Sequence, residues 1–392
     1  MNILIVKKIG SDIHGTVTLA LRLYNYFNNN GHNCYLTKYK KSSLLLNLPE
    51  PKKLIEVNEW NVRTHAKKYQ SLSFDVIYCL TSDDAIIGLQ IQRLFYTAAK
   101  VFLGIYHPRQ SFVPTKFLPN YKEHLNKKVF NLLPAENIIF MDEVCHKSHS
   151  QYYNLSLKKS PIIPLPMNIE GQELSSNYIK YKFSSVGRIT DCKPYPFGVI
   201  KAIANLKERG YKDMNYHIVG EGENFGQLKK MIEELSLQNY ITLYGSVPYT
   251  KINDIIKDSY CFIGMGTTVG EASGIGLPSL VAIVDDVEHT YGLLGNLPEN
   301  IVGEPGENLP LFNYSNAIEK LLHLSDDDYK KERRKSIEKA AFYSIEKVGK
   351  KFIEHFARGK NSSIKISWFS NLLFLLTKIQ VKYFIQKEFR HK

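Results

Sequence analysis

The sequence is poor in cysteine, tryptophan and long apolar runs, and each shortage excludes a class of protein. Its 392 residues include five cysteines and two tryptophans. No two cysteines form a C-x-x-C pair, which excludes a disulfide scaffold or a zinc ribbon and favours a reducing compartment. No stretch reaches the roughly eighteen apolar residues of a membrane span, and the start, MNILIVKKIG, is too short in apolar residues for a secretory signal. We therefore expect a soluble, cytoplasmic protein.

The composition that remains is that of an ordinary globular chain. Hydrophobic residues make up 44% and charged residues 23%, which excludes a disordered or fibrous protein. The length predicts about two domains.

Positive charge is unevenly distributed along the chain, with a net charge of +13. Residues 1–180 carry 22 Lys and Arg against 13 Asp and Glu, residues 181–346 carry 18 against 23, and residues 347–392 carry 11 against 2. No nucleic-acid-binding motif accompanies this charge, so we expect no nucleic-acid partner. A generally basic surface and an attraction to anionic lipid or to a phosphorylated acceptor both stay open.

Strands alternate with helices in both halves of the chain. The expected strands are 2–9, 34–37, 75–80, 101–105, 137–141, 181–186, 215–219, 241–244 and 260–263, and the expected helices are 16–28, 197–209, 224–235 and one opening near Thr268. Continuous apolar strands between helices predict parallel sheets covered on both faces. Two such domains, facing each other across a cleft, would bind ligands beyond the carboxyl ends of their strands.

Two glycine-containing segments lie at the ends of predicted strands. In Val186-Gly187-Arg188, followed by Lys193, a strand ends at a glycine and two cations follow. Arginine offers a planar two-pronged donor and lysine a point charge to a pyrophosphate, although the spacing alone favours two solvated surface cations. The turn Gly220-Glu221-Gly222 is a weak match to a dinucleotide fingerprint and is more typical of a plain tight turn.

A third segment, residues 263–278, combines a strand end, glycines and a helix start. Gly264 and Gly266 allow a ligand to approach the backbone closely. The helix that follows offers unpaired N–H groups and the positive end of its dipole to an anion. Glu271 lies about one turn inside this helix, where it suits either a ribose diol or a favourable charge near the helix N-terminus.

In order and spacing, these segments resemble the GT-B glycosyltransferases of the family 4 type (glycosyl transferases group 1). The family pattern runs G-R-x-x-x-x-K-G, then a G-x-G turn, F-x-G, and E-G-F-G-x-x-x-x-E-A-x-A-x-G-x-P-V. The segments in register are Gly187-Arg188 with Lys193, Gly220-Glu221-Gly222, Leu243-Tyr244-Gly245, Gly264-Met265-Gly266, and Glu271-Ala272 with Gly276-Leu277-Pro278. Gly15, Gly31-His32 and His107 match weaker positions of the first half, so the resemblance covers about residues 1–357.

The resemblance implies an α/β, GT-B architecture with two Rossmann-like domains facing a cleft. The acceptor-side domain would span 1–170 and the nucleotide-sugar-binding domain 181–345, with a linker over 171–180. A closing helix would span 346–359, and residues 360–392 would form an extension.

The resemblance also implies the reaction. The protein would be a retaining, metal-independent glycosyltransferase without a cofactor, and it would move a sugar from a UDP-type or GDP-type donor to a glycan or lipid-linked acceptor. Arg188 and Lys193 would bind the diphosphate and stabilise the charge on the leaving group, Glu271 would bind the ribose, and His107 would act near the sugar or acceptor. The remaining residues implied in substrate binding are Gly15, Gly222, Gly245, Ser246, Val247, Gly266, Thr267, Thr268 and Val269.

The sequence departs from the family pattern at one chemically important position. The family's first glutamate, which contacts the donor sugar, is replaced by Ile263. Two rival functions follow: a catalytically degenerate glycosyltransferase-like protein that binds glycan or a partner protein, and a GT-B nucleotide-sugar epimerase.

The extension over 360–392 carries its own pattern. Placed on a helix, its apolar residues share one face, six cations flank them, and its longest charge-free run is Ile366–Thr377. Twelve residues cannot span a bilayer, so we expect an interfacial helix on anionic lipid, with docking on the protein itself or on a second copy as the alternative. The expected setting is the cytoplasmic face of a bacterial membrane, with peripheral attachment, in the biosynthesis of capsule or lipopolysaccharide.

Overall fold

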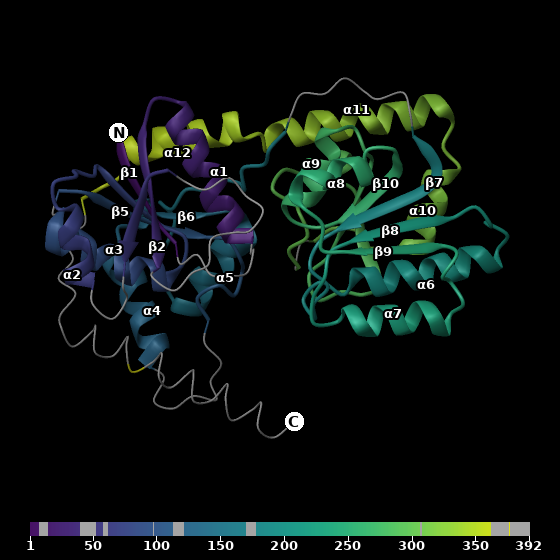
Figure 1. The fold of residues 1–392 in the computed structure, drawn as a ribbon, viewed down its shortest axis with the longest axis horizontal. Coiled ribbons are helices and arrows are strands. Elements are labelled where there is room, and N and C mark those ends of the chain that lie inside the picture. The colour runs from purple at the N-terminus through teal and green to yellow at the C-terminus, as the bar shows by residue number, and fades with distance from the viewer. Residues whose placement is uncertain are drawn as a thin grey trace. The chain divides into compact units, whose positions relative to one another are not determined.

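The computed structural model describes residues 1–7, 15–39, 52–57, 62–96, 98–112, 121–169, 178–305, 308–361 and 376. The chain divides into two compact units, one formed by Met1–Leu165 with the chain from Gly349 on, and one by Pro166–Val348. Each unit is built on its own β-sheet (Figure 1).

The first unit contains a six-stranded sheet in the order β3-β2-β1-β4-β5-β6, and every neighbouring pair is parallel. Its strands are β1 (Asn2–Val6), β2 (Asn33–Tyr39), β3 (Leu54–Val57), β4 (Val76–Cys79), β5 (Lys100–Ile105) and β6 (Ile138–Phe140). Its helices are α1 (Gly15–Asn29), α2 (Val62–Ala66), α3 (Ser82–Phe95), α4 (Tyr121–Leu132) and α5 (Glu143–Tyr153). The strand order reverses between β1 and β4, which is where open α/β sheets bind ligands.

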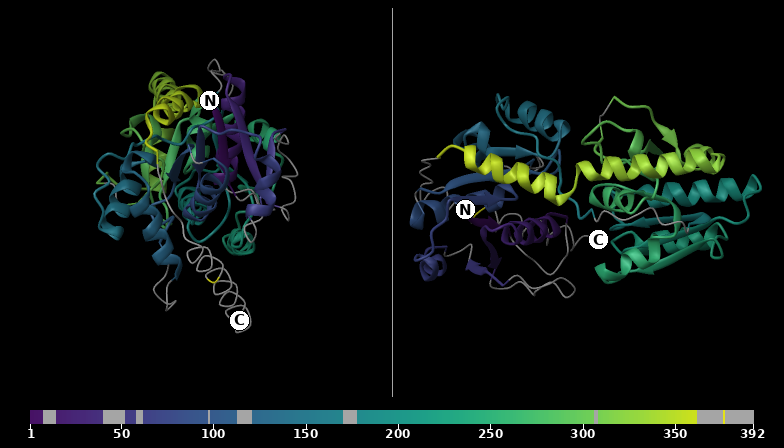
Figure 2. Two further views of the ribbon diagram at one scale, coloured as in Figure 1. Left: turned by 90° about the vertical axis from the view of Figure 1, so that its left-hand side faces the viewer. Right: turned by 90° about the horizontal axis from the view of Figure 1, so that it is seen from above.

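Helix α12 (Ile345–Arg358) completes the core of this first unit. The rings of Phe352 and Phe356 are fully buried and lie 5.5 and 5.2 Å from the ring of Tyr78 in β4. Phe356 also lies 4.8 Å from Phe102 of β5. Figure 2 shows α12, in yellow, beside the strands of this unit. The first unit is therefore discontinuous in sequence.

The second unit contains a seven-stranded sheet in the order β13-β12-β11-β10-β7-β8-β9. Its strands are β7 (Ile179–Val186), β8 (Asn215–Val219), β9 (Ile241–Gly245), β10 (Ser259–Gly264), β11 (Ser279–Ala282), β12 (His289–Leu293) and β13 (Phe312–Asn313). Its helices are α6 (Tyr195–Glu208), α7 (Phe225–Glu234), α8 (Tyr249–Ile256), α9 (Thr267–Gly274), α10 (Tyr314–Leu322) and α11 (Asp326–Phe342).

The prediction of wholly parallel sheets is correct for the first unit and wrong at one edge of the second. Strands β12 and β13 are antiparallel to their neighbours. The connection from Ala282 to His289 is short, and a parallel crossover needs a dozen or more residues. The chain can only turn back here.

Apolar residues cover both faces of the second sheet. One buried cluster joins the strands to α6, α7 and α10 and includes Phe183, Val199 and Ile318. The other joins them to α8 and α9 and includes Phe262 and Val269. In Figure 1, α6 and α7 lie on one side of the strands and α8 and α9 on the other.

The first and last segments of the second unit are hydrogen-bonded to each other. The Met167 N–H donates to the Tyr343 carbonyl at 2.8 Å, and the Ile345 N–H donates to the Met167 carbonyl at 2.9 Å. Gly270 of α9 packs on Met167, because a Cβ there would lie 2.1 Å from the Met167 sulfur. The second unit is thus a continuous insertion with its two ends tied together.

The predicted segments and the observed ones agree in type, with shifted ends. Strand β8 coincides with its predicted range, whereas β7 begins at Ile179, inside the segment expected to be a linker. Residues 171–177 and almost all of the extension, apart from 360, 361 and 376, lie outside the described residues. Among the helices that the structure describes, none is both long and apolar enough to cross a membrane.

Candidate functional site

Three loops of the second unit, which follow β7, β8 and β9, are joined through their backbones. The Gly187 N–H donates to the Val219 carbonyl at 3.0 Å, and the Gly220 N–H donates to the Gly245 carbonyl at 2.8 Å. A Cβ at Gly220 would lie 1.9 Å from the Gly187 oxygen, and one at Gly222 would lie 2.2 Å from the Ile189 oxygen. Only glycine permits this approach, so these positions fix the loop that carries Arg188.

Side chains add a second set of links between the same loops. The Asn224 amide donates to the Asp191 carboxylate at 2.8 Å, and the Ser246 hydroxyl donates to the Glu221 carboxylate at 3.1 Å. Arg188 is exposed on the loop that these bonds hold. The cation is therefore presented from a braced loop.

Lys193 lies at the end of this loop, before α6, in a less hydrated setting. Burial lowers the pKa of its ammonium, and the positive charge of Arg188 lowers it further, whereas Cys192 and Glu304 raise it. The chain after β11 contacts the segments that carry Glu304 and Lys193. The Val284 N–H donates to the carbonyl of Gly303, the residue before Glu304, at 2.8 Å. The Asp285 N–H donates to the carbonyl of Cys192, the residue before Lys193, at 3.2 Å. The sequence analysis did not indicate Glu304, which is buried.

The loop between β10 and α9 presents a helix N-terminus at the same edge of the sheet. Gly266 caps α9 with φ 67°, a left-handed value that favours glycine. Its N–H donates to the Val302 carbonyl at 2.6 Å, and a Cβ at this position would meet nothing within 4 Å. Thr267 and Thr268 open the helix, whereas the Val269 side chain is fully buried. Only the backbone of Val269 is therefore available to a ligand.

A cavity of about 300 Å³ lies between α8 and α9. Its lining residues are Asn168, Val186, Tyr249, Thr250, Ile252, Asn253, Ile256, Phe262, Thr268, Glu271, Ala272 and Ile275. Two of them, Thr268 and Glu271, were predicted from the sequence. The polar residues Tyr249, Thr250 and Asn253 were not, although their turn-by-turn spacing on α8 is typical of one helix face.

Ile263, where the sequence departs from the pattern it resembles, lies in the core and not on the cavity wall. Its side chain is fully buried in the cluster against α6. Its carbonyl accepts a hydrogen bond from the Ser185 hydroxyl at 2.6 Å. A carboxylate here would be buried among apolar side chains.

Two predicted residues, Gly15 and His107, belong to the first unit. Gly15 is the first residue of α1, and a Cβ there would meet nothing within 4 Å. His107 is exposed, and its Nδ1 accepts the Arg109 N–H at 3.0 Å. A neutral imidazole with Nδ1 as acceptor carries its proton on Nε2. His107 is thus suited to donate a hydrogen bond from Nε2.

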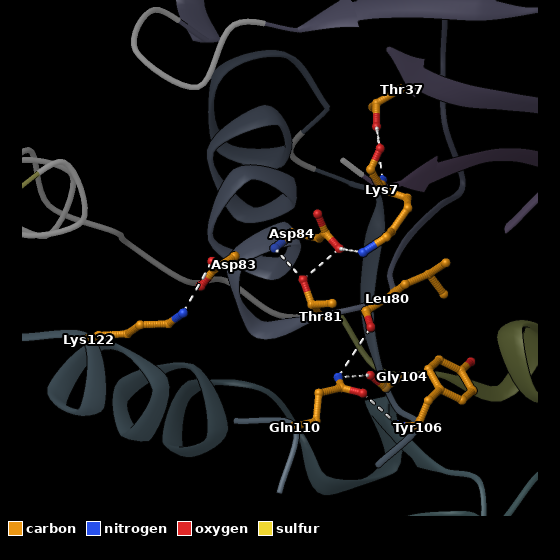
Figure 3. A network of polar contacts seen from close by, with 10 residues as sticks. All are labelled: Lys7, Thr37, Leu80, Thr81, Asp83, Asp84, Gly104, Tyr106, Gln110 and Lys122. Atoms are coloured by element: carbon orange, nitrogen blue, oxygen red, sulfur yellow. Dashed lines mark hydrogen bonds and ion pairs between the residues drawn. The ribbon is translucent and has the colours of Figure 1, made fainter. Parts of the chain in front are cut away.

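Gln110 ties the His107 loop to the ends of two strands (Figure 3). Its amide nitrogen donates to the carbonyls of Leu80 and Gly104 at 3.2 and 2.9 Å, and its amide oxygen accepts the Tyr106 N–H at 2.7 Å. The loop therefore has a fixed base on β4 and β5.

A network of charged and polar side chains lies at the reversal point of the first sheet (Figure 3). Lys7, directly after β1, lies 3.7 Å from the carboxylate of Asp84 in α3, and both side chains are nearly buried. Thr81 caps α3 by accepting the Asp84 N–H at 3.1 Å, and its hydroxyl donates to the Asp84 carboxylate at 2.6 Å. Lys7 is also tied to β2, because its N–H donates to the Thr37 hydroxyl at 2.9 Å. The sequence did not indicate this network.

Known proteins share both the motif-bearing segment and the fold. Residues 170–290 match the family described as "Glycosyl transferases group 1". An uncharacterized glycosyltransferase of Methanocaldococcus jannaschii, MJ1059, is 24% identical over an alignment of 282 positions, and the match covers 60% of this chain and 68% of that protein.

Two solved structures have a similar fold. Anabaena HepE, crystallised with UDP and glucose, has a TM-score of 0.65 and 12% identity, over 91% of this chain and all of that one. The lipopolysaccharide outer core galactosyltransferase WaaB has a TM-score of 0.58 and 14% identity, over 91% of this chain and 99% of that one.

The fold is thus the GT-B fold of glycosyltransferases, built from two Rossmann-like units. The family match over residues 170–290 and the curated relative identify the enzyme class, and the protein is a glycosyltransferase.

Proposed function

We propose that the second unit binds a nucleoside diphosphate sugar and that the enzyme transfers its glycosyl group to a hydroxyl acceptor. One observation carries the proposal. Around the carboxyl ends of β7, β8, β9 and β10, glycine-lined loops bring together two cations, a helix N-terminus and a cavity with a carboxylate. Each of these matches one part of such a donor.

The diphosphate would lie between the β7 loop and the start of α9. Arg188 and Lys193 would supply positive charge, and the backbone N–H groups of residues 267–269, in the first turn of α9, would supply donors. In the reaction, the bond between the anomeric carbon and the β-phosphate oxygen breaks. The acceptor oxygen bonds to that carbon, and the hydroxyl proton leaves with the released nucleoside diphosphate. The two cations would stabilise the negative charge that develops on this leaving group, so we propose a metal-independent transfer.

The nucleoside would occupy the cavity between α8 and α9. Glu271 would accept hydrogen bonds from the ribose hydroxyls, and residues 245–247 would lie next to the base. The structure of HepE contains UDP, which supports a UDP-type donor for this chain. The retaining outcome rests on the family resemblance alone.

The acceptor would bind to the first unit. His107 would donate a hydrogen bond from Nε2 near the sugar or acceptor. The name of WaaB as a lipopolysaccharide galactosyltransferase and the basic extension support a glycan or lipid-linked acceptor at an anionic membrane surface. This setting is the polysaccharide biosynthesis that we propose.

Ile263 favours one alternative, a GT-B protein that binds its ligand without turnover. The carboxylate that the family places at this position is absent, and the isoleucine is fully buried. Release of UDP from a UDP-sugar without acceptor would distinguish an enzyme from a binding protein. Interconversion of the donor would instead indicate an epimerase.

Calorimetric titration of UDP, GDP and ADP into the wild type and into Glu271→Ala tests the donor site. We expect one diphosphate to bind the wild type and to bind Glu271→Ala about tenfold or more weakly, because a charged hydrogen-bond acceptor is lost. Glu234→Ala is the matched control, since Glu234 is exposed on α7 and pairs only with Lys230 at 3.4 Å in the structure described. Absence of binding to the wild type would overturn the proposal.

A further inference from the structure

The cavity between α8 and α9 has an apolar floor and a polar mouth. Val186, Phe262 and Ile256 form part of the floor and belong to one buried cluster. Tyr249 and Thr250, at the start of α8, line the cavity near Thr268 and Glu271 of α9. Such a pocket suits a ligand with a flat apolar part and a hydroxylated part.

Tyr249 and Glu271 contact each other across this cavity. The Tyr249 hydroxyl donates to the Glu271 carboxylate at 3.4 Å. Tyr249 is the first residue of α8, follows Pro248, and keeps 43% of its surface exposed. Because proline fixes its own φ, the start of α8 and hence the direction of the tyrosine are restricted.

A carboxylate can accept about four hydrogen bonds, two at each oxygen. A partner within the protein, such as Tyr249, therefore does not by itself prevent Glu271 from accepting a hydrogen bond from a ligand. A long side chain that is held in one direction loses less conformational entropy when it binds. A tyrosine that orients Glu271 would increase the selectivity of this carboxylate for a diol.

We propose that Tyr249 is a positioning residue that orients Glu271 toward the ribose hydroxyls, so that the site selects ribonucleoside over deoxyribonucleoside diphosphates. This inference rests on the proposed donor site. It assigns to α8 a part of ligand selection that neither the motif spacing nor the family match assigns. The cavity wall formed by Tyr249 and Asn253, one turn apart on α8, would face the nucleoside.

The test compares the affinities of UDP and 2′-deoxy-UDP in calorimetry. We expect the wild type to prefer UDP and Glu271→Gln to lose most of this preference. Tyr249→Phe removes only the hydroxyl, and we expect it to lower the UDP preference about three- to tenfold, as one net hydrogen bond implies. Affinity for 2′-deoxy-UDP should change little.

Tyr211→Phe is a matched control in the same unit. The Tyr211 hydroxyl also donates to a carboxylate, that of Glu319, at 3.0 Å. It lies away from the cavity lining, so the UDP preference should stay at the wild-type value. Circular dichroism of each variant before and after heating verifies that it is folded.

The outcomes separate the two proposals. If Glu271→Gln loses the preference for UDP and Tyr249→Phe retains it, the positioning role of Tyr249 is wrong and the donor site stands. If the wild type binds neither nucleotide, both proposals are overturned. A weaker preference in Tyr211→Phe, equal to that in Tyr249→Phe, would also overturn the inference.

Discussion

The two sheets have a reversal of strand order at corresponding places, yet their surroundings differ. In the first unit the reversal lies between β1 and β4, and in the second between β7 and β10. At the first, Lys7 and Asp84 are nearly buried against each other. At the second, Gly187, Gly264 and Gly266 bring backbone to the edge, and Arg188 is exposed.

This difference shows how one topology can serve two purposes. Where a protein cation already has a buried carboxylate partner, the charge stabilises the fold and is not presented to solvent. Where glycines replace side chains, the backbone reaches the edge of the sheet and Arg188 is exposed on a braced loop, which is a setting typical of anion sites. Topology therefore locates a candidate site, and the side chains decide whether it binds.

The largest effect is expected from breaking the buried pair of the first unit. Asp84→Asn would leave the Lys7 ammonium without its counter-charge, and we expect a loss of about 3–5 kcal/mol in the free energy of unfolding. Denaturant unfolding followed by circular dichroism measures it, and hydrogen exchange of β1 and β4 assigns it to the first unit.

Asp83→Asn is the control for this prediction. Asp83 precedes Asp84 in α3, and its ion pair with Lys122, at 3.5 Å, leaves both side chains about 40% exposed, against 11% and 2% for Lys7 and Asp84. Exposed pairs contribute about 0–1 kcal/mol. Equal destabilisation by both variants would mean that burial of the Lys7 pair has no special effect.

An intermediate effect is expected from adding a side chain where the second unit has none. Gly222→Ala places a Cβ 2.2 Å from the Ile189 carbonyl oxygen, so the loop that carries Arg188 and Lys193 must shift. We expect UDP affinity to fall about ten- to a hundredfold, or about 1.4–2.8 kcal/mol, as measured by calorimetry. Gly226→Ala, four residues on in α7, meets nothing within 4 Å and should leave affinity unchanged. An unaltered affinity in Gly222→Ala would contradict the close contact.

The smallest effect concerns the charge of Lys193. Burial lowers the pKa of this lysine below the usual 10.5, and Glu304 opposes the shift. The ammonium therefore loses its proton at a lower pH than an ordinary lysine, so UDP affinity should decline earlier as the pH rises from 7 to 10. Glu304→Gln removes a charge that raises this pKa, and the decline should begin at still lower pH. In Glu234→Gln it should not move, and the titration of uracil is common to all three proteins. A decline at the same pH in Glu304→Gln as in the wild type would show that Glu304 does not act on Lys193.

Local patterns predicted the part of the fold that depends on neighbours in sequence. The apolar run of β8 and the glycines at 187, 220, 222 and 266 were located from the sequence because strand ends and turns need particular residue types within a few positions. The same reasoning placed Glu271 one turn inside α9.

Features that join distant segments escaped prediction. Lys7 was not singled out, because its ion pair exists only once β1 and α3 come together. Tyr249 was not singled out either, because its contact needs α9 to lie opposite α8. The antiparallel edge of the second sheet depends on the short connection between β11 and β12, and the prediction of parallel strands took no account of its length. These three features depend on the tertiary fold, because the periodicity of apolar residues describes a single helix or strand and not its neighbours in space.

The discontinuity of the first unit has a consequence for the order of folding. Phe352 and Phe356 complete its core, and they are among the last described residues to leave the ribosome. The sheet of the first unit is therefore synthesised long before the helix that covers it. Meanwhile the insertion between Pro166 and Val348 can fold on its own, with its two ends joined by the pairing of Met167 with Tyr343 and Ile345. Once these ends are joined, the stretch of flexible chain between the sheet of the first unit and α12 is effectively shorter, and closing it costs less entropy. The unit translated first is the one that folds to completion last.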